Sequence, residues 1–381
     1  MASATDRRLR VLCVSPAHPS HDPRVLKTIR ALSQQHDVRA LLPWQIGASV
    51  GILPFFERVA VRALLVHPLV LWHILRQRPE VLHVFMPELL PVGLLFRLLG
   101  GRVVYEVQEN LRLKFDRKPR NKARWLRWLF EHFDQLARRW CYCIFTEDSY
   151  LGEYDTLALP YAVVRNFPEV AVLPEMSAGR PRSFPKHDIS STSPQATDLC
   201  YLGLITLDRG LDTMLAVVNE LRKQYPTVRL HLFGRCLLSE TELQALPHFA
   251  EVRSHLFFYG QVKHETAFPI MARCVAGLAL LKPVGDYPDS YPTKVFEYMA
   301  SGIPAITSYF PLYQSVVETN ECGFCVEPAD VPLVVEHINW LFERPQEVNR
   351  LGVNGKQAIE RLYNWTEEAK KLLKLYQYID F

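Results

Sequence analysis

The stretch Asp289-Ser290-Tyr291-Pro292-Thr293-Lys294-Val295-Phe296-Glu297-Tyr298-Met299-Ala300-Ser301-Gly302-Ile303-Pro304 carries more information on fold and function than any other part of this chain. Its apolar spacing after Pro292 predicts an amphipathic helix with Thr293, Lys294 and Val295 in the first turn. The first N–H groups of a helix have no partner within the helix and attract phosphate. Lys294 adds a positive charge, and Glu297 can accept hydrogen bonds from both hydroxyls of a ribose. Together these groups would suit a sugar nucleotide.

The same stretch resembles the nucleotide-sugar motif of the retaining, GT-B type glycosyltransferases of family 4, the group 1 type. The family signature is two acidic residues separated by seven others, and Asp289 and Glu297 have this separation. The family has Glu as the first acid, where this chain has Asp289. The resemblance implies that Asp289 faces hydroxyls of the donor sugar and that Glu297 faces the ribose. It is strongest over Asp198 to Glu318.

A second segment of the chain resembles the glycine loop of the same family. Tyr201-Leu202-Gly203-Leu204-Ile205-Thr206-Leu207-Asp208-Arg209-Gly210-Leu211 has the loop glycine, Gly203, and the following basic-Gly pair at Arg209. Many family members have an arginine directly after the first glycine, where this chain has Leu204. Glycosyl transfer builds negative charge on the departing diphosphate, and cations there stabilise the transition state. The resemblance therefore implies a catalytic role for Arg209 beside Lys294.

Two further strand ends of the second half resemble loops that contact phosphate and base in related proteins. Phe233-Gly234-Arg235 ends one predicted strand, and Gly260-Gln261-Val262 follows another. The resemblance implies that Gly234, Arg235 and Gln261 belong to the nucleotide site. Glycine is also common at strand ends for purely conformational reasons.

The first half of the chain contributes candidates for the donor sugar or the acceptor. Many family members have a histidine at the strand end where this chain has Gln108, followed by Glu109. Glutamine can donate and accept hydrogen bonds, but it cannot transfer a proton as imidazole does. His18, His21 and Arg24 lie in or next to the loop after the first strand, which faces the ligand in doubly wound sheets. We expect these three residues to contact the acceptor or the diphosphate.

Each leading candidate also has a simpler explanation. Arg209 could be a solvated charge before a helix, and Glu297 an exposed carboxylate favoured by the positive end of the helix dipole. Asp289 could be a turn residue, because Asp286 to Pro292 is rich in turn formers. The sequence alone leaves these alternatives open.

Length and periodicity predict two domains. The chain has 381 residues, more than a single core usually supports, and short β-rich runs alternate with helical patterns in both halves. We expect an α/β fold of the GT-B type, with two Rossmann-like domains facing a central cleft and a C-terminal helix that returns to the first. The expected parts are an acceptor domain at 1–167, a linker at 168–197, a nucleotide-sugar domain at 198–362 and the crossover helix at 363–381.

Composition narrows the classes of binding partner and the cellular compartment that we expect. The formal net charge of +4 is only mildly basic, which gives no case for nucleic acid. Eight cysteines lack framework spacing and no apolar signal segment opens the chain, so a reducing cytoplasm fits best. Cys322 and Cys325 have the spacing of a redox motif, but we expect them to be structural. We find no convincing metal-ligand spacing, and the resemblance implies neither a metal nor a cofactor beyond the sugar nucleotide.

One basic segment predicts attachment to a membrane surface. Arg112 to Arg139 contains ten basic residues against three acidic ones, interleaved with aromatic residues such as Trp125 and Trp128. Such a segment suits anionic lipid headgroups. The alternative is an ordinary helix with a solvated basic face. No segment is apolar enough to span a bilayer, so we expect a cytoplasmic protein peripheral to the cytoplasmic face of the membrane.

The sequence thus predicts a retaining glycosyltransferase that moves a sugar from a nucleoside diphosphate sugar to an acceptor, lipid-linked or a cell-surface glycan precursor. Two alternatives remain. One is a sugar-nucleotide epimerase on the same fold, since fold alone does not fix the reaction. The other is a non-catalytic nucleotide-binding partner of a transferase at the membrane, which Gln108 and Leu204 would explain.

Overall fold

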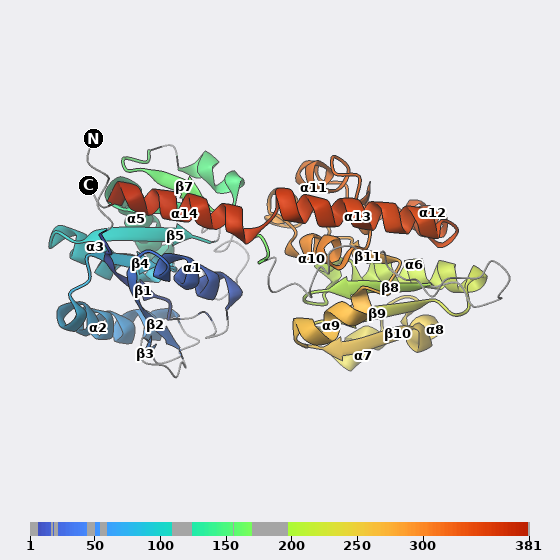
Figure 1. The fold of residues 1–381 in the computed structure, drawn as a ribbon. Coiled ribbons are helices and arrows are strands. Elements are labelled where there is room, and N and C mark those ends of the chain that lie inside the picture. Colours follow the sequence, from blue (N-terminus) through green and yellow to red (C-terminus); the bar gives the residue numbers. More distant parts are fainter. Residues whose placement is uncertain are drawn as a thin grey trace. The chain divides into compact units, whose positions relative to one another are not determined.

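The computed structural model describes residues 7–16, 18, 22–43, 50–53, 59–108, 124–154, 156–169 and 197–379. The chain forms two units, of which unit 1 comprises Met1–Asn166 with Thr366–Phe381 and unit 2 comprises Phe167–Trp365. Each unit is a parallel sheet with helices on both faces, as Figure 1 shows. Within the described part of the chain, no helix is both long and apolar enough to cross a membrane.

Unit 1 contains a seven-stranded sheet in the order β3-β2-β1-β4-β5-β6-β7, and all its strand pairs are parallel. Its strands are β1 Arg10–Val14, β2 Asp37–Pro43, β3 Val50–Leu53, β4 Val81–Val84, β5 Arg102–Val107, β6 Tyr142–Phe145 and β7 Tyr161–Val163. Its helices are α1 Pro23–Ser33, α2 Val59–Gln77, α3 Leu90–Leu98, α5 Arg124–Trp140 and α14 Trp365–Ile379, with 3-10 turns η1 Pro87–Leu89 and η3 Asp148–Glu153.

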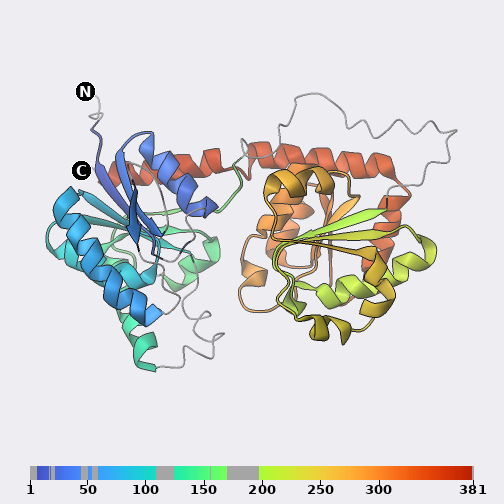
Figure 2. The same cartoon turned by 90° about the horizontal axis from the view of Figure 1, so that it is seen from below.

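Helices cover both faces of the unit 1 sheet, so its central strands are buried almost throughout. α1 and α14 lie on one face, and α2, α3 and α5 lie on the other (Figure 2). α1 begins as its sequence predicts, because the Asp22 side chain accepts a hydrogen bond from Val25 N at 3.0 Å and Pro23 occupies the first turn. The C-terminal helix α14 belongs to unit 1, which confirms the predicted return of this helix.

Unit 2 contains a six-stranded parallel sheet in the order β10-β9-β8-β11-β12-β13. Its strands are β8 Asp198–Leu202, β9 Arg229–Phe233, β10 Leu256–Gly260, β11 Ala276–Ala279, β12 Ala305–Ser308 and β13 Gly323–Val326. Its helices are α6 Leu211–Gln224, α7 Glu240–Gln244, α8 Phe249–Val252, α9 His264–Met271, α10 Thr293–Ser301, α11 Pro311–Val317, α12 Val331–Phe342 and α13 Pro345–Arg361, with 3-10 turns η5 Leu207–Arg209, η6 Arg253–His255 and η7 Tyr287–Asp289.

The unit 2 core has two halves, one on each face of the sheet. Leu199 and Tyr201 of β8 point into the half that α6 and α12 cover, whereas Cys200 points into the half beneath α9 and α10. The strand order reverses between β8 and β11, so these two strands form the topological switch point. Doubly wound sheets bind ligands beyond the carboxyl ends of the strands at this point.

Most predicted elements are present, and the differences have local causes. The sequence did not predict β3 or β7, which are short strands at the two edges of the unit 1 sheet. Most of the predicted linker, 170–196, lies outside the described residues. Cys322 and Cys325 are both buried with free thiols, and burial raises the pKa of each thiol to about 12. Such thiols are poor nucleophiles, and their burial agrees with the predicted structural role.

Candidate nucleotide-sugar site at the switch point of unit 2

Two cations of unit 2 meet beside Gly203, the first residue after β8. Gly203 has a backbone φ of +131°, and a Cβ there would lie 3.3 Å from Arg209 Nη1 and 3.4 Å from Lys294 Cε. Gly203 and Arg209 belong to the connection from β8 to α6, whereas Lys294 lies in the first turn of α10, after β11. The two connections that flank the switch point therefore bring together three residues predicted from sequence.

Lys294 is a buried cation in contact with an aromatic ring. The residue is 6% exposed, and no carboxylate among the described residues forms an ion pair with it. Its Nζ lies 5.4 Å from the centroid of the Tyr201 ring, which gives a cation–π contact. Burial and then the neighbouring Arg209 lower the pKa of Lys294 to about 7, while Glu297 acts in the opposite direction. An anion bound here would favour the charged ammonium.

Arg209 is held by an aromatic hydroxyl rather than by a carboxylate. Its Nε donates to Tyr287 OH at 3.3 Å, and its guanidinium carbon lies 5.5 Å from the centroid of that ring. Tyr287 belongs to η7, which follows β11, so this contact ties the two connections at the switch point to each other. The contact leaves the net charge of Arg209 uncompensated within the described part of the chain.

Glu297 lies one turn beyond Lys294 on α10 and has a partner that sequence reasoning missed. His264 Nε2 lies 3.2 Å from Glu297 Oε1, and the His264 ring stacks on Phe268 at 4.9 Å. His264 is the first residue of α9 and follows the predicted loop residue Gln261 by three positions. The hydrogen bond to Glu297 raises the pKa of His264, partly opposed by burial and assisted by Glu265.

The glycines at the strand ends allow neighbouring backbone segments to approach each other closely. A Cβ on Gly234 would lie 1.9 Å from Gly203 O, so no other residue fits at this position. The N–H of Gly203 donates to Phe233 O at 2.8 Å, and that of Gly234 donates to Gly260 O at 2.8 Å. These N–H groups are therefore occupied. Arg235 and Gln261 follow these strand ends, and both are exposed.

The remaining predicted residues of the cassette differ in accessibility. Thr293 is the first residue of α10 and is exposed, whereas the Val295 side chain is fully buried in the core. Val295 N donates to Pro292 O at 2.9 Å, so neither its side chain nor its N–H is available to a ligand in this conformation. Asp289 ends η7 and is exposed.

Unit 1 places charged residues at the corresponding edge of its own sheet, in a different arrangement. Arg24 Nε donates to Glu106 Oε1 at 2.8 Å, and both side chains are buried. His83 Nε2 lies 3.4 Å from Glu106 Oε2, and its Nδ1 lies 2.8 Å from Tyr376 OH on α14. Burial alone would raise the pKa of Glu106, but Arg24 and His83 hold it well below its usual value. We predicted that Arg24 faces acceptor or diphosphate, and the structure places it inside this network.

Gln108 is attached to the same network. Its Nε2 donates to Glu106 Oε1 at 2.8 Å. An ionised carboxylate only accepts hydrogen bonds, so the amide nitrogen of Gln108 faces Glu106 and its carbonyl oxygen points elsewhere. Near the end of β1, His18 Nδ1 lies 2.7 Å from Ser15 Oγ. His21 and Glu109 lie outside the described residues.

The described part of the basic segment is less positive than its sequence suggests. Arg127 pairs with Glu131 at 2.9 Å, and Arg138 pairs with Asp134 at 2.9 Å. Trp128 is 63% exposed and carries an apolar surface into solvent. Residues 109–123, which contain most of the predicted basic cluster, lie outside the described residues.

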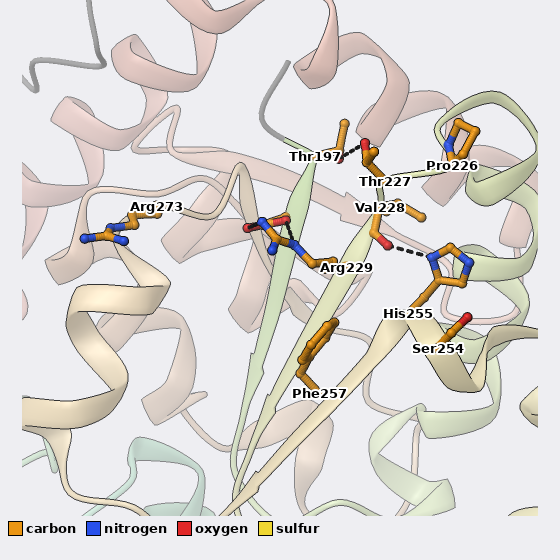
Figure 3. Close-up of a pocket in the computed structure, with 10 residues that line it drawn as sticks. Thr197, Pro226, Thr227, Val228, Arg229, Ser254, His255, Phe257 and Arg273 are labelled. Carbon is orange, nitrogen blue, oxygen red and sulfur yellow. Dashed lines mark hydrogen bonds and ion pairs between the residues drawn. The ribbon is translucent and has the colours of Figure 1, made fainter. Parts of the chain in front are cut away.

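Figure 3 shows a hollow of unit 2 at the opposite edge of the sheet, near the amino-terminal ends of β8, β9 and β10. Its volume is about 780 Å³. The Arg229 guanidinium donates to Asp198 through two bonds of 2.8 Å, and His255 Nδ1 lies 2.8 Å from Val228 O. Internal partners thus satisfy these groups, and ligands of such sheets bind at the other edge. Among the described residues, no group of three or more His, Cys, Asp or Glu side chains could hold a metal ion.

The doubly wound sheets and their connections define the class of the protein, which has the GT-B fold. Sucrose-phosphate synthase from Thermosynechococcus elongatus superimposes with a TM-score of 0.72 at 16% identity, over 97% of this chain and 98% of that one. HepE from Anabaena, solved in complex with UDP-glucose, superimposes with a TM-score of 0.69 at 15% identity, over 97% and 99% of the two chains.

The family match falls on the unit that holds the two cations. Residues 183–358, which include Gly203, Arg209 and Lys294, match the family model described as glycosyl transferases group 1. An MMP alpha-(1->4)-mannosyltransferase from Mycolicibacterium hassiacum is 33% identical over 82 residues, which are 21% of this chain. The matched segment spans only 20% of that curated relative's length.

Proposed function

We propose that the protein transfers a sugar from a nucleoside diphosphate sugar to an acceptor hydroxyl, with retention of the anomeric configuration. The observation that carries this proposal is the meeting of Arg209 and Lys294 beside Gly203, at the switch point of the unit that matches the group 1 glycosyltransferase family model. Neither cation has an acidic ion-pair partner among the described residues, so both can serve a bound diphosphate. HepE, which shares the fold, has been solved with UDP-glucose.

The proposed reaction breaks the bond between the anomeric carbon and a diphosphate oxygen and forms a bond from that carbon to the acceptor oxygen. The acceptor hydroxyl gives its proton to the departing phosphate oxygen on the same face of the sugar. Arg209 and Lys294 stabilise the negative charge that grows on the diphosphate. Glu297 binds the ribose hydroxyls, Asp289 orients the donor sugar, and Gln108 of unit 1 accepts a hydrogen bond from sugar or acceptor.

Nucleotide binding is the first test of this proposal. Thermal unfolding should be followed with UDP, GDP, ADP, CDP and TDP and with their sugars, because a ligand that binds only the folded state raises the melting temperature. We expect one base to stabilise the protein, and we expect turnover of its sugar when a suitable acceptor is added. Binding without turnover across a broad acceptor panel would favour the non-catalytic alternative, and isomerised donor without acceptor would favour the epimerase. Absence of binding to every nucleotide would contradict the proposal.

We propose further that the protein attaches peripherally to an anionic membrane and acts on a lipid-linked acceptor there. Apolar side chains on three helices of one face of unit 1 support this. α3 contacts both α2 and α5, and these helices with their adjoining residues expose Leu75 (75%), Leu98 (65%), Leu99 (74%) and Trp128 (63%). Aliphatic and aromatic residues beside basic ones are typical of surfaces that enter the lipid headgroup region.

Sedimentation with vesicles tests this attachment. We expect the protein to pellet with vesicles that contain phosphatidylglycerol and to remain in solution with pure phosphatidylcholine. Leu98→Ser and Trp128→Ser should weaken the pelleting without lowering nucleotide affinity, because both side chains are already exposed. Equal pelleting with both kinds of vesicle, or none with either, would remove the anionic membrane as partner.

A further inference from the structure

His264 and Glu297 form a pair at the edge of the candidate site. His264 Nε2 lies 3.2 Å from Glu297 Oε1, and the second oxygen, Oε2, has no partner among the described residues. The pair is partly accessible, since the His264 side chain is 44% exposed and that of Glu297 is 21% exposed. The stacking of His264 on Phe268, at an interplanar angle of 9°, limits the orientations open to the imidazole.

Resting on the proposed function, we infer that His264 is a positioning residue for ribose recognition, which fixes the Glu297 carboxylate so that Oε2 accepts the hydroxyls of the nucleotide. An unrestrained glutamate on a helix samples several rotamers and loses side-chain entropy when it binds. The bond from α9 holds one oxygen of Glu297 before the ligand arrives. The preference for ribose over deoxyribose therefore depends on His264 as well as on Glu297.

The charges around the imidazole predict how this preference changes with pH. Glu297 of α10 and Glu265 of α9 both favour protonated His264. The other charged residue of α10 is Lys294, three residues before Glu297. The hydrogen bond to Glu297 raises the pKa of His264. The charged pair is thus complete below that raised pKa and is lost as the pH rises through it. Discrimination between ribose and deoxyribose should fall over the same range.

The test compares affinities for UDP, GDP and ADP with those for their 2′-deoxy and 3′-deoxy forms, by calorimetry between pH 6 and pH 8.5. The ratio of affinities isolates the contribution of the ribose hydroxyls, because both forms carry the same diphosphate and would contact Arg209 and Lys294 equally. For the base that binds, we expect the native protein to prefer ribose by roughly tenfold or more at pH 6, the range for a hydrogen bond to a charged group. The ratio should decline toward pH 8.5.

Two variants separate positioning from packing. His264→Phe keeps a ring against Phe268 but removes the donor, and it should reduce the ratio to about threefold or less at every pH. His264→Gln keeps a neutral donor, and its ratio should equal the lower ratio of the native protein at pH 8.5 and stay the same at every pH. His337→Phe is the matched control, because His337 also stacks on a phenylalanine of unit 2, Phe324, at 4.3 Å. This control should leave both the ratio and its pH dependence unchanged.

The outcomes distinguish this inference from the proposed function. If His264→Phe folds and discriminates as well as the native protein, His264 does not position Glu297. If the native protein binds a nucleoside diphosphate but does not distinguish ribose from deoxyribose, the inference fails while the diphosphate site remains. If no nucleoside diphosphate binds at all, the proposed function fails and the inference fails with it. Should His264→Phe not fold, the pH profiles of the native protein and His264→Gln decide the question.

Discussion

In both units, basic side chains lie toward the same edge of a doubly wound sheet, but they have different kinds of partner: a carboxylate in unit 1 and aromatic rings in unit 2. In unit 1, Arg24 donates to Glu106 at 2.8 Å, and both side chains are buried. In unit 2, Arg209 contacts the hydroxyl and ring of Tyr287, and Lys294 lies over the ring of Tyr201. Within the described residues, neither of these two cations has a carboxylate as an ion-pair partner.

This difference separates charges that hold the fold from charges that can bind a ligand. An aromatic partner orients a cation without cancelling its charge, whereas a buried carboxylate cancels it. The network around Glu106 joins α1, β4, β5 and, through His83 and Tyr376, the C-terminal helix α14. We therefore expect unit 1 to lose stability, and unit 2 to lose nucleotide binding, when a cation is removed.

The largest expected effect is on the stability of unit 1. Arg24→Met removes one partner of a buried ion pair and leaves the Glu106 carboxylate with incomplete compensation, which costs about 3–5 kcal/mol in comparable cases. The free energy of unfolding should be measured by urea titration with a probe in unit 1. A loss below about 1 kcal/mol, within the range of surface ion pairs, would show that Arg24 is not part of the structural network and would return it to the ligand candidates.

A smaller effect, on binding alone, is expected from Arg209→Met. A hydrogen bond to a charged group contributes about 1.5–3 kcal/mol, so the affinity for a nucleoside diphosphate should fall roughly ten- to a hundredfold. The melting temperature without ligand should change little, because Arg209 compensates no buried carboxylate among the residues that the structure describes. Arg222→Met serves as the control, since Arg222 lies on α6 of the same unit and bonds Asn219 at 3.0 Å. Equal affinity of the Arg209 variant and this control would contradict the comparison.

Sequence patterns sufficed for the parts of the site that depend on local order. The helix start at Thr293, the basic residue Arg209 before α6 and the glycine after β8 all follow from short-range patterns, and the structure brings Gly203, Arg209 and Lys294 together. The doubly wound order then places these connections at one edge of the sheet. The family resemblance singled out Gly203 and Arg209, and secondary structure and topology then sufficed to place them beside Lys294 without knowledge of side-chain packing.

The contacts that the sequence could not predict depend on packing between distant elements. The pair of His264 and Glu297 requires α9 and α10 to lie side by side, and no spacing within either helix indicates it. The Glu106 network carried a partial signal, since a glutamate within the apolar run of β5 demands a buried cation. Its actual partners come from α1, β4 and α14, which only the folded chain identifies.

A third prediction concerns the pH dependence of the cation pair. Burial and Arg209 lower the pKa of Lys294 to about 7, so Lys294 is charged below this value and loses its proton above it. The proposed contact with the diphosphate requires the charged form, and affinity should therefore weaken from pH 7 to pH 9 by at most roughly tenfold per pH unit.

Calorimetry with the 2′,3′-dideoxy form of the nucleoside diphosphate isolates this effect, because that ligand lacks the ribose hydroxyls for which we propose Glu297 as the acceptor. The terminal phosphate is already ionised in this range, since its second pKa is about 6. Lys294→Met should bind weakly and show no such slope. A slope in the variant equal to that of the native protein would assign the titration to another group.

The smallest effect tests the charge network of unit 1 for an indirect role in catalysis. Glu106 accepts a hydrogen bond from the amide nitrogen of Gln108 at 2.8 Å. The carbonyl oxygen of Gln108 therefore remains available as an acceptor. Gln108→Met removes this acceptor, and kcat/KM for glycosyl transfer should fall about three- to tenfold, as expected for one neutral hydrogen bond. Gln108→Glu keeps an acceptor but places a second carboxylate beside Glu106, so part of the lost kcat/KM should be recovered at lower pH, where the new carboxyl is protonated.

Gln244→Met is the control, because the amide nitrogen of Gln244 in unit 2 also donates a hydrogen bond to a glutamate, Glu240, at 3.3 Å. If both Gln108 variants transfer sugar as fast as this control, Glu106 holds Gln108 for structural reasons alone, and the charges of unit 1 have no part in the reaction.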